Sequence, residues 1–135
     1  MKISRNRANG KRYEGELVKT LRSLKIYARL GRSNEEVDVI IPSANIGIEL
    51  KSTNRNDSWT FGCTNPRKTK DQYRRLLLSP MIIYYAIRFK GQGIAGLRLY
   101  SIPPEMCSLK KNEGLTLEEF VILVQKNTQE VSHAI

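Results

Sequence analysis

A chain of 135 residues is the size of one domain, and its 23 Lys and Arg against 13 Asp and Glu give it a formal net charge of +10. This charge favours a nucleic-acid partner over a basic surface that serves solubility alone, and no small-molecule substrate is expected. The composition excludes a membrane span because the longest apolar stretch is Met81–Ile87. Two distant cysteines, Cys63 and Cys107, and one histidine, His133, exclude a zinc site, a disulfide framework and histidine catalysis, so an active site must use carboxylates and lysines.

Residues 1–12 are polar and basic. They lack the apolar core of a signal peptide, so we expect a cytoplasmic protein, in the host cytoplasm if the source is viral. Because they carry charge but almost nothing to bury, we expect a flexible arm that binds DNA through Arg5, Arg7, Lys11 and Arg12.

A helix is predicted over about residues 11–24, where apolar residues recur at helical spacing. On a helical wheel Glu14 lies within this apolar stripe, three residues before Leu17, whereas Glu16 points away. A carboxylate on the packed side of a helix needs a partner, and a bound metal ion would supply one. The alternative is an acid that is favoured only by the dipole at the helix start.

Two segments rich in β-branched residues, Val37–Ile41 and Ile46–Lys51, are predicted to form a hairpin around a four-residue turn at 42–45. This register places Asp38 opposite Glu49, with Cβ atoms roughly 4.5–5.5 Å apart, where like charges destabilise unless something neutralises them. Magnesium, with manganese as a substitute, is the predicted neutraliser because magnesium prefers one or two carboxylates plus water and phosphate oxygens.

Lys51 follows Glu49 by two residues, so the alternation of side chains along a strand places both on one face. There an ammonium group would hold the attacking water or stabilise charge that develops on a phosphate. The alternative is an ordinary cross-strand ion pair on a solvated face.

Residues 52–65 are predicted to form a polar loop, in which Trp59 and Phe61 are core, interface or nucleic-acid stacking residues, with core or interface favoured. Thr69 and Gln72 have the spacing of a capping box that would start a basic helix ending near residues 79–80.

Two further strands, Met81–Phe89 and Leu97–Ile102, are predicted on either side of a glycine-rich turn at 90–96. After these strands, Thr116 and Glu119 form a second capping box, ahead of a helix with apolar residues on one side. The predicted order of elements is therefore α, β, β, α, β, β, α.

The helical Glu, the Asp that begins one strand and the Glu-x-Lys on the next are similar to the PD-(D/E)xK nuclease superfamily. More closely, about residues 8–102 resemble archaeal-type Holliday-junction resolvases, and the Gln72 helix and the Ala86–Phe89 strand follow in the family's order. The residues that carry the resemblance are Glu14-Gly-Glu-Leu-Val-Lys-Thr-Leu21, Arg29, Ser33, Val37-Asp38-Val-Ile40 and Ile48-Glu49-Leu50-Lys51. Val37 stands where the superfamily name has proline, and Gly15 replaces a basic residue of some members.

The resemblance implies a single α/β domain with a mixed central β-sheet flanked by helices, the restriction-endonuclease-like nuclease fold. Its nuclease core would span residues 13–102, and residues 103–135 would be a C-terminal helical extension of the same domain. The implied activity is magnesium-dependent cleavage of four-way (Holliday) junctions. Because resolution needs two cuts in strands related by a two-fold axis, we expect a symmetric homodimer that makes paired cuts.

The resemblance also assigns roles to residues. Glu14, Asp38 and Glu49 would bind the metal ion, and Lys51 would serve the hydrolytic step. Ser33 and Arg29 would contact or orient the scissile phosphate, with a turn serine and a surface arginine as the alternatives. Two rival functions remain open: another PD-(D/E)xK DNA nuclease, restriction-like or repair-associated, and a non-catalytic basic DNA-binding module.

Overall fold

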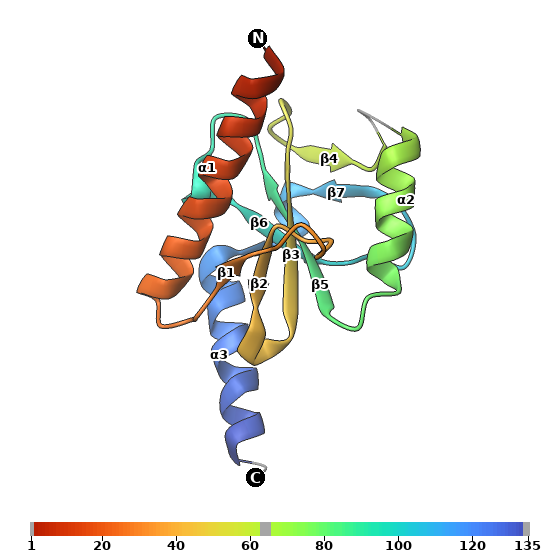
Figure 1. Cartoon of the computed structure of the whole chain (residues 1–135). Coiled ribbons are helices and arrows are strands. Elements are labelled where there is room, and N and C mark those ends of the chain that lie inside the picture. Colours follow the sequence, from red (N-terminus) through yellow and green to blue (C-terminus); the bar gives the residue numbers. More distant parts are fainter. Residues whose placement is uncertain (1, 63–65, 134–135) are drawn as a thin grey trace.

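The computed structural model describes the backbone of residues 2–62 and 66–133, and the side chains of these residues except 2–11 and 129–133. Three α-helices and eight β-strands follow one another along this part of the chain (Figure 1). In chain order they are α1 (Lys2–Ser23), β1 (Arg29–Leu30), β2 (Val39–Ile41), β3 (Ile46–Ser52), β4 (Ser58–Thr60), α2 (Pro66–Leu77), β5 (Ile82–Arg88), β6 (Arg98–Ser101), β7 (Ser108–Lys110), β8 (Leu115–Thr116) and α3 (Leu117–His133).

Six strands form the central sheet in the order β1-β2-β3-β5-β6-β8. β3 and β5 run parallel and the other neighbours run antiparallel, so the sheet is mixed. The chain between the parallel strands β3 and β5 has to cross over, and this connection contains β4 and α2. The predicted fold class, a single α/β domain with a mixed sheet flanked by helices, is confirmed.

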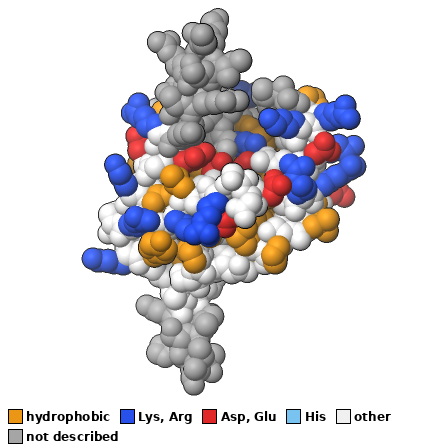
Figure 2. Space-filling view, viewed as in Figure 1, with side chains coloured by type: hydrophobic (Ala, Val, Ile, Leu, Met, Phe, Trp, Pro, Cys, Tyr) orange, Lys and Arg blue, Asp and Glu red, His pale blue; other side chains and the backbone are white. Residues whose placement is uncertain are grey.

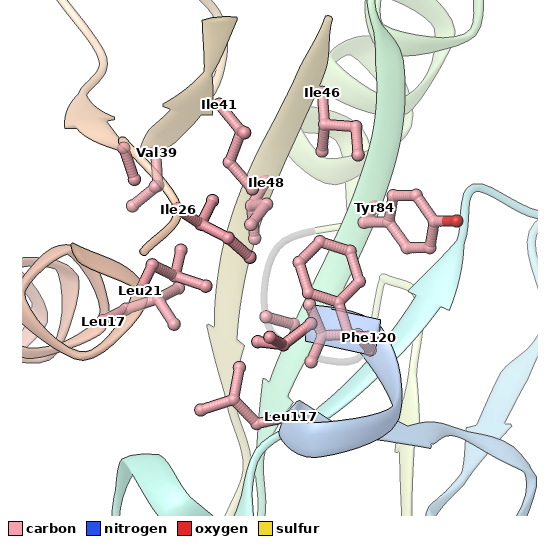
Figure 3. Packing of buried hydrophobic residues seen from close by; sticks show 14 of the residues in the cluster. Leu17, Leu21, Ile26, Val39, Ile41, Ile46, Ile48, Tyr84, Leu117 and Phe120 are labelled. Carbon is pink, nitrogen blue, oxygen red and sulfur yellow. The ribbon is translucent and has the colours of Figure 1, made fainter. Parts of the chain in front are cut away.

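Helices cover both faces of the central sheet (Figure 1). α1 and α3 pack on one face, where Leu17 and Leu21 of α1 and Phe120 of α3 meet the apolar side chains of β2 and β3 (Figure 3). α2 and the small β4–β7 sheet cover the opposite face, and Tyr73 of α2 and Leu109 of β7 belong to the buried cluster there. We call these the α1/α3 face and the α2 face.

The predicted hairpin is confirmed in its register. Val39 pairs with Ile48, Ile40 with Gly47 and Ile41 with Ile46. A short 3-10 turn (Pro42–Ala44) joins the strands, and Asn45 closes it in the left-handed conformation with φ 53°. The favoured interpretation of Trp59 and Phe61 is also confirmed, since these side chains are only 6% and 9% exposed and pack in the core of the α2 face.

The second predicted capping box is confirmed at the start of α3. The Glu119 carboxylate accepts the N–H of Thr116 at 3.0 Å, and the N–H of Glu119 donates to the Thr116 hydroxyl at 3.1 Å. The prediction of a capping box at Thr69 and Gln72 is wrong, because α2 begins at Pro66 and both residues lie inside the helix. Proline is favoured in the first turn of a helix, where its missing N–H costs no hydrogen bond.

Two other expectations need correction. α1 begins at Lys2, so most of the expected arm at residues 1–12 is helical in its backbone. Apolar periodicity marks the part of a helix that packs, and it gives no signal for a helix that continues beyond the packed part. The predicted loop at residues 52–65 contains β4, which pairs with β7 about fifty residues later, a contact that local patterns do not report.

None of the helices in the described part of the chain combines the length and the apolar character needed to cross a membrane. Cys107 is an exposed free thiol, whereas Cys63 lies outside the described residues. His133 ends α3, and its side chain lies outside the described ones.

Candidate active site

The carboxylates of Asp38 and Glu49 contact each other where β2 begins beside β3. The backbone of Asp38 leaves the regular ladder, since its N–H donates to the carbonyl of Ile48 at 3.0 Å. One Asp38 carboxylate oxygen, Oδ2, accepts the N–H of Leu50 at 2.8 Å, which orients this side chain against β3. The proximity of the two carboxylates that the hairpin register predicted is therefore present.

Glu49 is buried, with only 5% of its surface exposed. Burial raises the pKa of Glu49 to about 8, and the contact with Asp38 and its negative charge act in the same direction. The Lys51 ammonium and the Gln72 amide lower this pKa but do not cancel the rise. Both burial and a like charge disfavour the ionised form of Glu49. A cation bound between the two carboxylates would stabilise their ionised forms.

Lys51 lies on the same face of β3 as Glu49, as strand alternation predicted. Its Nζ is 3.4 Å from Glu49 Oε2 and donates to the side-chain oxygen of Gln72 at 2.9 Å. The amide nitrogen of Gln72 donates to the same Glu49 oxygen. Gln72 therefore holds the carboxylate and the ammonium group together from α2.

Sequence reasoning missed Gln72 as part of this site, because its spacing from Thr69 suggested a helix cap. Helical periodicity contained a usable signal, since Gln72 lies four residues before Leu76, which is 1% exposed. That spacing puts Gln72 on the packed side of α2. Only the fold, however, places α2 over β3.

The loop between β1 and β2 positions Asp38. The N–H of Gly31 donates to the Asp38 carbonyl at 2.8 Å. A Cβ on Gly31 would lie 1.9 Å from the Val37 carbonyl oxygen, so only glycine permits this close approach.

Arg29 has a defined partner in the same loop. Its guanidinium donates to both carboxylate oxygens of Glu35 at 2.7 and 2.9 Å, and the Arg32 N–H adds a third hydrogen bond at 2.8 Å. The hydrogen bond from Arg29 and that from the Arg32 backbone lower the pKa of Glu35 to about 2. Arg29 thus closes the loop that ends at Asp38, while Ser33 is exposed on that loop.

Glu14 is not brought into a three-carboxylate cluster with Asp38 and Glu49. Among the described residues, no three His, Cys, Asp or Glu side chains are grouped so that they could hold a metal ion. Glu14 is half-buried on α1, which packs on the α1/α3 face, whereas Glu49 and Lys51 meet Gln72 on the α2 face. A helical wheel identifies the packed side of a helix, but not which face of a sheet the helix covers.

The basic residues expected to bind DNA fall into two groups. Arg12 is exposed and pairs with Glu16 at 3.1 Å, whereas the side chains of Arg5, Arg7 and Lys11 lie outside the described ones. α2 adds an exposed basic surface beside the site, and Figure 2 shows Lys and Arg side chains gathered on that side of the molecule. The exposed basic residues of α2 are Arg67, Lys68, Lys70, Arg74 and Arg75.

Comparisons with known proteins identify a fold and no sequence family. No family model matches the chain, and no curated protein matches its sequence. Among solved structures, the fold is similar to that of Hjc, a Holliday junction resolvase from the archaeal hyperthermophile Archaeoglobus fulgidus. The TM-score is 0.55 at 14% sequence identity, and the match covers 84% of this chain and 95% of that chain. The two proteins thus share their architecture over nearly the whole of the archaeal chain.

Proposed function

We propose that this chain is a metal-dependent DNA endonuclease that resolves four-way junctions. The observation that carries the proposal is the buried Glu49 beside Asp38, with the Lys51 ammonium 3.4 Å away. A strongly perturbed carboxylate with a like-charged partner is more typical of a functional site than of a structural ion pair. The similarity to a resolvase fold and the net charge of +10 support branched DNA as the substrate.

The donor set fits a hard divalent cation. Asp38 and Glu49 offer carboxylate oxygens, and magnesium is commonly held by one or two carboxylates together with water and phosphate oxygens. When bound, magnesium or manganese would polarise the scissile phosphate and activate a water molecule. Asp38, held by the Leu50 N–H, and Glu49, held by Gln72, would keep the oxygen ligands in place.

Lys51 would act on the reacting groups directly. Its ammonium is held by the Gln72 side-chain oxygen, so it is oriented before the substrate arrives. In that position it would hold the attacking water or stabilise the negative charge that grows on the phosphate. The exposed Ser33 would contact a phosphate, whereas Arg29 would act through Glu35 by ordering the loop that ends at Asp38.

DNA would be held by the basic surfaces around the site. Arg5, Arg7, Lys11 and Arg12 on α1 are one proposed contact region, and the exposed basic surface of α2 is a second. We further propose that two copies of the chain act together as a symmetric homodimer, because each chain supplies one site and resolution needs two cuts.

A cleavage assay tests the proposal. Radiolabelled four-way junction, flap and linear duplex DNA are incubated with the protein in magnesium, in manganese and in EDTA. We expect cleavage of the junction in preference to the other substrates, and only with a metal. Equal cutting of duplex or flaps would instead favour another nuclease of the superfamily, and binding without cutting in every metal would favour a DNA-binding module.

A further inference from the structure

A basic pocket lies between the β4–β7 sheet and β6, and its lining does not include Asp38 or Glu49. It has a volume of about 580 Å³, and its lining includes the cationic side chains of Arg98, Lys110 and Lys111. The one carboxylate in the lining belongs to Asp57, which pairs with Arg55 at 3.3 Å. The pocket therefore has an excess of positive charge.

The strand register links this pocket to the candidate active site. Lys51 on β3 is paired with Ile87 on β5, and Ile87 is paired with Arg98 on β6. Register partners on neighbouring strands point to the same face, and Ile87 is buried on the α2 face. Two strand spacings of about 4.8 Å put the backbones of Lys51 and Arg98 about 10 Å apart on that face.

We propose that this pocket binds a backbone phosphate of the same DNA strand, a few nucleotides from the scissile phosphate. The spacing of about 10 Å exceeds the distance between neighbouring phosphates of one strand, so the phosphate in the pocket is not the immediate neighbour of the scissile one. This inference rests on the proposed function, since it takes the phosphate at Lys51 to be the scissile one. It assigns a substrate contact to residues 103–116, for which the sequence indicated no role.

The backbone that carries the two lysines is anchored, so both side chains extend from fixed positions in the lining of the pocket. The Tyr100 hydroxyl donates to the Lys110 carbonyl at 2.6 Å, and the Lys111 N–H donates to the Asp57 carbonyl at 2.8 Å. None of the ion pairs among the described residues involves Arg98, Lys110 or Lys111. A bound phosphodiester would give these cations an anionic partner through charge-assisted hydrogen bonds.

The test compares two double variants that remove the same charge. Lys110→Gln/Lys111→Gln removes the pocket lysines but keeps the backbone hydrogen bonds, and Lys19→Gln/Lys126→Gln removes two exposed lysines on α1 and α3. Affinity for a radiolabelled four-way junction is measured in EDTA over a range of salt concentrations. Loss of one phosphate contact should weaken binding about tenfold and reduce the slope of log K against log salt by about 0.9.

The control variant should change both quantities much less, because Lys19 and Lys126 lie outside the pocket and are not among the proposed DNA contacts, so no phosphate contact is lost. Equal effects in the two variants would overturn the inference. Ethylation interference on the bound junction locates the contact. Ethylation of one phosphate a few nucleotides from the cleavage site should weaken binding of the unsubstituted protein but not of the pocket variant. An identical interference pattern in both proteins would also contradict it.

The binding experiments contain no metal, so their result does not depend on cleavage. A protein that binds the junction but never cuts it contradicts the proposed function, whereas the pocket is judged by the salt slope and the interference pattern alone. Lys110→Arg/Lys111→Arg should restore the affinity, because arginine keeps the charge and binds phosphate well.

Discussion

At the scale of residues, the Asp38–Glu49 pair is held in place by its surroundings although it is electrostatically unfavourable. Leu50 fixes Asp38 through its N–H, and Gln72 fixes Glu49 through its amide. Gln72 also holds Lys51, so one helical residue orders two members of the site. Side chains whose positions are fixed before the substrate binds lose less entropy when the transition state forms.

Asp38→Asn and Glu49→Gln are predicted to abolish cleavage. Each change removes a charged oxygen ligand, whereas phosphate contacts elsewhere dominate DNA affinity, so junction binding should stay within about threefold. Single-turnover cleavage and filter binding measure the two quantities, and Lys51→Ala should behave in the same way. Retained cleavage in either carboxylate variant would remove these residues from the active site.

The stability of the metal-free protein is predicted to fall as the pH rises. The pKa of Glu49 is raised from 4.5 to about 8, so the folded state holds this proton more tightly than the unfolded state does. The resulting stability is fully present below about pH 4.5 and is lost as the pH rises toward about 8. Urea denaturation in EDTA between these values should show this slope, and Glu49→Gln should lack it. Parallel curves for both proteins would contradict the raised pKa.

Exchanging Glu14 and Glu16 one at a time tests whether the glutamate on the packed side of α1 takes part in cleavage. Glu14 is half-buried, whereas the Glu16 carboxylate pairs with the exposed Arg12. The helical wheel predicts that Glu14→Gln lowers the cleavage rate and Glu16→Gln leaves it unchanged, whereas the packing of α1 on the face opposite Gln72 predicts that neither change affects cleavage. Loss of activity in Glu16→Gln alone would contradict the placement of Glu14 on the packed side of α1 and of Glu16 on the exposed side.

At the scale of elements, sequence patterns within a few residues predicted that helices are present better than they predicted where the helices begin. The capping box at Thr116 and Glu119 specified the start of α3 because both partners lie within one turn. The same spacing at Thr69 and Gln72 was misleading, since Pro66 begins α2 and Gln72 bonds to β3 instead. Where a side chain has both a local and a distant candidate partner, the tertiary structure decides which of them it binds.

Deletion of residues 1–11 tests the N-terminal half of α1. The truncated chain keeps Leu17 and Leu21, which are fully buried, so its thermal unfolding should remain cooperative. Because four basic side chains are lost, we expect weaker junction binding and a flatter dependence of affinity on salt. An unchanged salt slope would place this segment away from the DNA.

At the scale of the whole molecule, the structure narrows the surfaces available for a dimer. Trp59 and Phe61, which the sequence offered as core or interface residues, are buried within one chain. Of the apolar strand Met81–Ile87, Ile82 is 55% exposed, whereas its neighbours from Ile83 onward are buried. The exposed apolar side chains available to a proposed interface between copies therefore include Ile82, Leu78 and Ile122.

A cruciform plasmid tests the predicted dimer. A symmetric pair of sites makes both cuts within one binding event and should yield linear product directly. A monomer makes independent nicks, so open circles should accumulate first. Sedimentation at the assay concentration gives the mass. A monomer that yields mainly open circles would refute the resolvase proposal and leave the nuclease chemistry standing.

By itself, the sequence determined the charge of the molecule, the hairpin register that brings the carboxylate of Asp38 near that of Glu49, and the shared face of Glu49 and Lys51. These features depend on residues close together in the chain, where turn length and side-chain alternation limit the choices. Only the tertiary structure decided the β4–β7 pairing, the meeting of Gln72 with β3, and the separation of α1 from the α2 face. Those contacts join distant segments, and they follow from burying apolar area over the whole chain, which no local pattern encodes.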